Sequence, residues 1–149
     1  MTATTYRRYI KLGHQGEEMP DDATDYVAVR TQFFDAATGT IKSLDWCRDT
    51  LPCGEVNHAD AVKACEQLEL CGHKDWRLPP VEELLSLVDR SRHGPAIDPI
   101  FNCESAYYWT STPVAFAPSE FAWIVGFNYG STYWSNHDSN FVRAVRSSQ

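Results

Sequence analysis

The residues of this chain best suited to hold a ligand lie in one segment, residues 128–140, with the sequence NYGSTYWSNHDSN. Tyrosine and tryptophan give large contact areas at little cost in conformational entropy, and Ser, Gly and Asn give adaptable hydrogen bonds. We expect a long loop between two strands, and loops of that length tend to be functional. The predicted ligand contacts are Asn128, Tyr129, Ser131, Tyr133, Trp134, Asn136, His137, Asp138 and Asn140.

Motifs of covalent and hydrolytic catalysis are missing from the sequence. It contains no H-E-x-x-H, no G-x-S-x-G and no glycine-rich phosphate loop, and its five histidines are scattered through polar or turn-like contexts. We therefore expect no enzymatic activity, no catalytic residue and no cofactor.

The five cysteines are an odd number and form no C-x-x-C pair, so the spacing of a zinc ribbon is absent. Cys65 and Cys71, with His58 and His73 nearby, could form a mixed metal site. The alternative is that these thiols are reduced and behave as small apolar groups in the core. We predict no metal and favour this second interpretation.

The length and the net charge of the chain indicate one domain that does not bind nucleic acid. Its 149 residues fit one domain, with an N-terminal strand and acidic loop over 1–25 and the body over 26–149. The net charge of −7, with only 13 Lys and Arg, argues against nucleic acid as a partner. No secretory signal and no apolar stretch approaching about 18 residues is present. We expect a protein without membrane insertion, cytoplasmic or assembled into a virion.

Residue patterns predict two helices and several short strands. Residues 58–70 have a helical stripe with Asn57 as the cap and Gly72 as the end, and a second helix begins after DWRLP with Pro80 at its first helical position. The predicted strands cover residues 26–34, 107–112, 121–127 and 141–146. Helices early and strands late predict an α+β fold.

The ordered motifs "GHKDWRLPPVEELLSLVD", "AIDPIF", "YYWTST", "FAWIVGF" and "FVRAVR" resemble the Lcl C-terminal domain family over about residues 26–146. The resemblance implies a loop-rich C-type-lectin-like fold with two helices and a small irregular antiparallel sheet. It also implies a relationship to formylglycine-generating-enzyme-type domains and to variable proteins of diversity-generating retroelements. Ligand binding is the known role in this family, including adhesion to sulfated polysaccharide.

Two positions depart from the family pattern. Pro80 stands where the family has a Thr or Asn cap, and Ala144 stands where it often has a cysteine. The resemblance implies that such a cysteine pairs with the position of Cys65, a bridge that Ala144 cannot make. The motif residues Trp76, Arg77, Pro79, Trp109 and Trp123 are expected to organise the fold. For Arg77 we expect a planar fork that binds carboxylates or carbonyls.

These observations predict a non-enzymatic, phage- or prophage-related ligand-binding module that binds a protein or a surface glycan through residues 128–140. The alternatives are a structural or accessory virion or tail component, or an intracellular interaction protein that blocks a host factor; a homo-oligomer is possible. Every residue type in 128–140 except Trp is reachable from AAC or AAT codons by changing adenines. We therefore hypothesise that the segment is, or descends from, a region varied by a retroelement.

Overall fold

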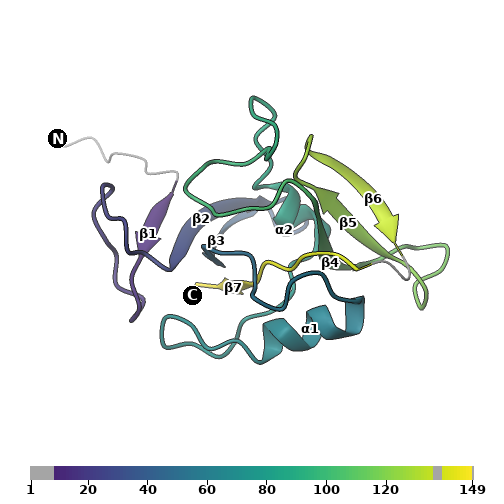
Figure 1. Cartoon of the computed structure of the whole chain (residues 1–149), viewed down its shortest axis with the longest axis horizontal. Coiled ribbons are helices and arrows are strands. Elements are labelled where there is room, and N and C mark those ends of the chain that lie inside the picture. Colours follow the sequence, from purple (N-terminus) through teal and green to yellow (C-terminus); the bar gives the residue numbers. More distant parts are fainter. Residues whose placement is uncertain (1–8, 136–138, 149) are drawn as a thin grey trace.

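The computed structural model describes residues 9–135 and 139–148, and it shows an α+β fold with two antiparallel sheets (Figure 1). The larger sheet has the order β1-β2-β3-β7 and the smaller sheet the order β4-β5-β6. The strands are β1 (Ile10–Leu12), β2 (Ala28–Asp35), β3 (Thr40–Cys47), β4 (Tyr107–Pro113), β5 (Ala122–Gly126), β6 (Ser131–Ser135) and β7 (Val145–Ser147). The helices are α1 (His58–Glu66) and α2 (Val81–Leu85). The α+β class with two helices is confirmed, but two small sheets replace the single one expected.

The small sheet lies at the opposite end of the molecule from β1 (Figure 1). Helix α2 packs against β4 and β5, and α1 contacts β4. No helix in the described ranges is long and apolar enough to cross a membrane.

Helix α1 begins where the sequence predicted, because the side chain of Asn57 accepts a hydrogen bond from the backbone N–H of Asp60 at 2.9 Å. It ends at Glu66, earlier than the predicted Leu70, and Gln67 is its C-terminal cap. The prediction that Gly72 ends this helix was wrong. Gly72, with φ of 75°, instead turns the chain between Leu70 and His73, whose backbones pair with each other.

Helix α2 is a single short stretch whose cap comes from another part of the chain. Pro80 occupies the N-cap position and not the predicted first helical position, and it offers no side-chain hydrogen bond. The backbone N–H of Val81 instead donates to Oγ1 of Thr112, 2.9 Å away on β4. A distant threonine thus supplies the acceptor that Pro80 lacks.

The segment DWRLP is joined to β7 and to α2 by its backbone and its charges. Arg77 exchanges backbone hydrogen bonds with Val145 at 2.8 and 3.0 Å. Its guanidinium donates two bonds to the carboxylate of the buried Glu83, at 2.9 and 3.2 Å. Arg146 binds Asp75 at 2.7 Å and the buried Asp45 of β3 at 2.9 Å. The side chain of Arg146 therefore connects elements far apart in the sequence, whereas that of Arg77 joins DWRLP to the helix that follows it.

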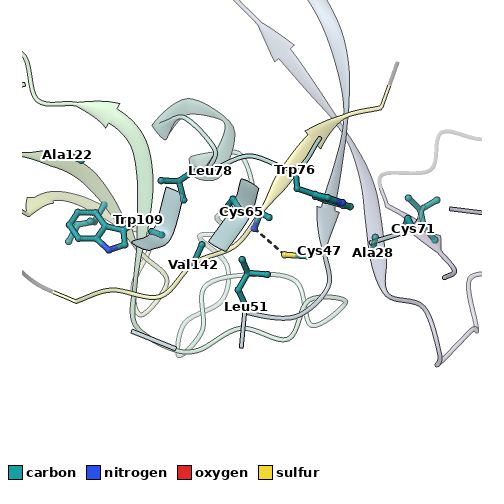
Figure 2. Packing of buried hydrophobic residues seen from close by; sticks show 14 residues of the cluster. Ala28, Cys47, Leu51, Cys65, Cys71, Trp76, Leu78, Trp109, Ala122 and Val142 are labelled. Carbon is teal, nitrogen blue, oxygen red and sulfur yellow. Dashed lines mark hydrogen bonds between the residues drawn. The ribbon is translucent and has the colours of Figure 1, made fainter. Parts of the chain in front are cut away.

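Two clusters of apolar side chains form the core. Figure 2 shows the first, which extends from Trp109 and Ala122 at the small sheet, past Cys65 and Trp76, to Cys71. The second contains Trp46, Tyr108 and Phe127, together with residues of α2. Pro79 is also buried, in the turn before α2.

Arg143 is fully buried, yet its partners are carbonyl groups and not carboxylates. Its guanidinium donates to the carbonyls of Cys47, Arg48 and Asn102 at 2.7, 2.8 and 2.5 Å. It also lies over the rings of Phe101 and Tyr108, with centroid distances of 5.2 and 5.8 Å. This cation holds together, inside the protein, the carbonyl at the end of β3 and two loop carbonyls.

Candidate functional site

The segment 128–140 is not one loop, and the prediction of a single connecting loop was wrong. The chain turns tightly between β5 and β6, with the N–H of Gly130 donating to the carbonyl of Gly126 at 2.9 Å. Gly130 has φ of 86°, which suits glycine at this turn. Ser131–Ser135 then pair along the whole of β5. Asn136, His137 and Asp138 lie outside the described residues.

Because side chains alternate along a strand, β6 directs its two predicted ring anchors to opposite faces of the small sheet. Tyr133 contacts Tyr107 edge to face, with centroids 5.7 Å apart. Trp134 contacts Trp123, directly across on β5, with centroids 5.9 Å apart and ring planes at 88°. These two anchors therefore cannot form one flat platform together.

Trp134 belongs to a group of four aromatic side chains that we call the ring surface. Phe116 lies edge to face against Trp134 at 6.0 Å and also contacts Phe121 at 5.6 Å. Trp134 is 53% exposed and Phe116 is 69% exposed, whereas Trp123 and Phe121 are half-buried. The ring surface consists of Phe116, Phe121, Trp123 and Trp134. Trp123 was expected to organise the fold, and the structure places it in the support of this exposed group.

A cleft of about 400 Å³ adjoins the ring surface at Phe121. Polar groups line it from both sheet and helix: Ser111, Ser119, Glu120, Ser135 and His58. His58 is held there by a hydrogen bond between Nε2 and the carbonyl of Thr110 at 2.9 Å, and by edge-to-face contact with Trp109. The cleft thus provides hydroxyl groups and one carboxylate beside exposed rings.

Asn140 was predicted as a polar ligand contact, and the structure corrects this. It is 5% exposed, and its backbone pairs with that of Val56 through two hydrogen bonds of 3.0 Å. Val56 lies just before α1. The pairing with it buries Asn140, so the side chain of Asn140 is not on a ligand surface.

The remaining predicted contacts lie at the turn end of β6. Tyr129 is 76% exposed, and the side chain of Asn128 accepts a bond from its backbone N–H at 2.9 Å. The carbonyl of Asn128 accepts a further bond from Gly94. Ser131 is half-buried and pairs with Gly126. Tyr129 presents its ring to solvent, five positions before Trp134 and at the other end of β6.

The groups considered for a metal site differ in burial. Cys65 and Cys71 are buried in the core, and His58 and His73 are half-buried. Cys65 is fully buried and Cys71 is nearly so, with its Sγ donating to the carbonyl of Gly13 at 3.3 Å. Burial raises the pKa of the Cys65 thiol and raises that of Cys71 to about 11. Metal ligation needs the thiolate, so both environments disfavour it. Among the described residues, no group of three or more His, Cys, Asp and Glu is arranged to hold an ion.

A second cleft, of about 890 Å³, lies against the loop at residues 91–104. Its lining includes Cys103, whose pKa is raised by burial, and charged groups of both signs such as Arg92 and Glu104. Asp49 at its wall is already bound to the amide of Asn102 at 2.6 Å. It offers no exposed aromatic group comparable to the ring surface.

Phe116, Phe121 and Tyr107 were not among the predicted site residues. A signal was present in the sequence, since Phe116 and Phe121 flank the turn APSE and no Lys or Arg occurs anywhere in residues 93–142. A search for rings without neighbouring cations would have found them. Their grouping with Trp134, however, depends on strand pairing that the sequence pattern does not display.

Comparison with family models finds one match, to a family described as the Lcl C-terminal domain, over residues 35–146. The matched range begins at the end of β2 and ends within β7, so it includes both helices and the whole small sheet. Comparison with curated proteins finds no match.

Proposed function

This chain belongs to the Lcl C-terminal domain family, and from that premise we propose that it is a non-enzymatic ligand-binding module. Its ring surface, together with the adjoining cleft, binds a protein or a surface glycan. The observation that carries this proposal is the exposure of Trp134 and Phe116 in mutual contact at the end of the small sheet.

Exposed aromatic groups that touch one another are uncommon on a surface that meets only water. Single exposed apolar residues are ordinary, but contiguous apolar patches mark interaction sites. Tryptophan also dominates the energetics of binding surfaces, because it buries a large area with few rotatable bonds. These properties support a binding role for the ring surface.

The adjoining cleft supplies what a purely apolar patch lacks. Ser111, Ser119 and Glu120 offer hydroxyl and carboxylate groups that can orient a ligand at the edge of the rings. A ligand that covers the rings and reaches this cleft gains both apolar contact and directional hydrogen bonds.

The C-type-lectin-like relationship and the retroelement hypothesis stay predictions. The second is checked by the codons of residues 128–140: adenine-rich codons, a near-identical template repeat and a neighbouring reverse-transcriptase gene would support it. Codons poor in adenine would contradict it.

The proposed function is tested by removing the rings without disturbing the fold. The double variant Phe116→Ala/Trp134→Ala is immobilised beside the wild-type chain and challenged with host lysate, and the captured partner is identified by mass spectrometry. We expect the partner to be lost from the double variant and retained by Phe34→Ala, whose ring is 61% exposed on β2, outside the ring surface. Equal capture by all three proteins would contradict the proposal.

A further inference from the structure

The charges around the ring surface restrict what can bind there. Residues 93–142 contain no Lys or Arg, so β4, β5, β6 and their connections carry no permanent cation. Glu120 is exposed, lines the cleft beside Phe121 and forms no ion pair with any described residue. The immediate surroundings of the rings are therefore acidic.

The elements packed against the small sheet do not reverse this charge. Helix α2 contributes Glu82 and no basic residue, while the charge of its Glu83 is balanced by Arg77. Helix α1 places Asp60 in the first turn, at the end whose His58 and Ala59 line the cleft, and Lys63 in the last turn. The chain as a whole has a net charge of −7, which favours the approach of basic partners.

Three aromatic rings elsewhere in this chain, those of Tyr26, Phe101 and Tyr108, are covered by its own cations. Lys11 and Arg48 lie over the ring of Tyr26, with centroid distances of 4.6 and 4.0 Å, and Arg143 lies over Phe101 and Tyr108. Within residues 9–135 and 139–148, no Lys or Arg makes such a contact with the four rings of the ring surface. The exposed parts of Trp134 and Phe116 can therefore accept a cation from outside.

We infer that the partner of the ring surface is a protein with a basic patch, whose Arg or Lys side chains lie against Trp134 and Phe116 beside Glu120. This inference rests on the proposed function and names the ligand class. Tryptophan is the best aromatic acceptor of a cation, and the free carboxylate completes the complementary charge. A sulfated or otherwise anionic glycan is disfavoured, because no basic residue is available on these strands to bind its anions.

The test uses a peptide with three arginines separated by glycines and a twin in which citrulline, of the same shape but uncharged, replaces each arginine. Heparin and a neutral oligosaccharide are the other probes. Binding is followed by NMR through the indole N–H signal of Trp134, which is assigned from its absence in Trp134→Ala. We expect the arginine peptide to move this signal and to bind at least about fivefold more tightly than its twin, with affinity falling as salt is added.

Variants show whether the contact is specific. Glu120→Gln should weaken the arginine peptide about two- to fivefold, and Trp134→Ala about fivefold or more. Glu66→Gln, which removes an exposed carboxylate at the far end of α1, and Phe34→Ala should leave the affinity unchanged.

Three results would overturn the inference: equal binding of the two peptides, equal binding by Trp134→Ala, or no movement of the Trp134 signal with the arginine peptide. If heparin or the neutral oligosaccharide moves that signal instead, the ring surface is still a binding site and only the ligand class is wrong. If lysate capture also survives loss of the rings, the proposed function fails as well.

Discussion

Trp134 of β6 lies directly across from Trp123 of β5, with the two rings edge to face and their centroids 5.9 Å apart. Cross-strand pairing fixes both backbones, and each ring limits the rotamers that the other can adopt. The exposed indole of Trp134 is therefore held in position before a ligand arrives. Preorganisation of this kind reduces the entropy lost on binding.

Trp134→Ala should destabilise the protein only slightly. Its ring is half exposed, so the loss is limited to its ring contacts, about 1 kcal/mol in the free energy of unfolding. The comparison is Trp109→Ala, which removes a fully buried ring whose Nε1 donates to the carbonyl of Val56 at 2.7 Å and should cost about 3–5 kcal/mol. Urea denaturation of both variants measures the difference. Similar losses would place Trp134 in the core and contradict its role in a surface.

Arg146→Met should be strongly destabilising. It removes the partner of Asp45, whose side chain is 3% exposed, and leaves that carboxylate with Arg30 alone. Breaking a buried ion pair on one side costs about 3–5 kcal/mol. The control is Lys42→Met, which breaks a partly exposed pair with Asp35 and should cost less than about 1 kcal/mol. A small effect of Arg146→Met would show that this network does not hold β3 and β7 together.

Thr112→Val should destabilise the protein by about 1 kcal/mol, because it removes the acceptor for the backbone N–H of Val81 while conserving shape. Thermal or chemical denaturation measures the loss. Thr38→Val is the matched control, since the hydroxyl of Thr38 bonds to Thr40 in an exposed turn and does not cap a helix. An unchanged stability would mean that water replaces Thr112 at the start of α2.

Stability should fall in acid, and Asp75 contributes to the fall. The hydrogen-bonded guanidinium of Arg146 lowers the pKa of Asp75 below its ordinary value of 3.8. Because the folded pKa is lower than the unfolded one, the contribution is fully present above about pH 4 and is lost as the pH falls through the folded pKa. Asp75→Asn should therefore lose less stability than the wild type when acidified, as measured by denaturation at a series of pH values. An identical pH dependence would exclude this contribution.

The contribution of Asp75 to the loss of stability in acid can be separated from those of two other carboxylates, Asp35 and Asp89. Hydrogen bonds from Lys42 and from Ser91 lower the pKa values of Asp35 and Asp89, so some acid sensitivity should persist in Asp75→Asn. If Asp75→Asn removed all dependence of stability on acid, Asp35 and Asp89 would make no such contribution.

Local signals predicted much of this fold. Asn57 is the cap of α1, α2 begins one residue after the predicted Pro80, and Arg77 binds a carboxylate in the fork geometry expected of its guanidinium. Each depends on residues within one turn or a few positions, where residue type and spacing carry the information. The α+β class followed from the same elements and is confirmed.

The candidate site was less accessible to sequence reasoning. Residues 131–135 contain serine and threonine among two rings, and the surrounding Asn and Gly suggested a loop. Pairing with β5 decides their conformation, and strand formation depends strongly on such tertiary context. Asn140 was misassigned for the same reason, since its burial comes from pairing with Val56, far away in the sequence.

The position of β7 beside β3 also has a consequence for synthesis. Arg146 bonds to Asp45 across 101 positions and to Asp75 across 71, and Val145 pairs with both Trp46 and Arg77. A nascent chain on the ribosome therefore leaves the edge of β3 open until residues 145–147 have emerged. Contacts between residues so distant in sequence form slowly, and an open edge invites pairing with other chains. Chaperone protection during translation should matter more for this domain than for helical domains of its size.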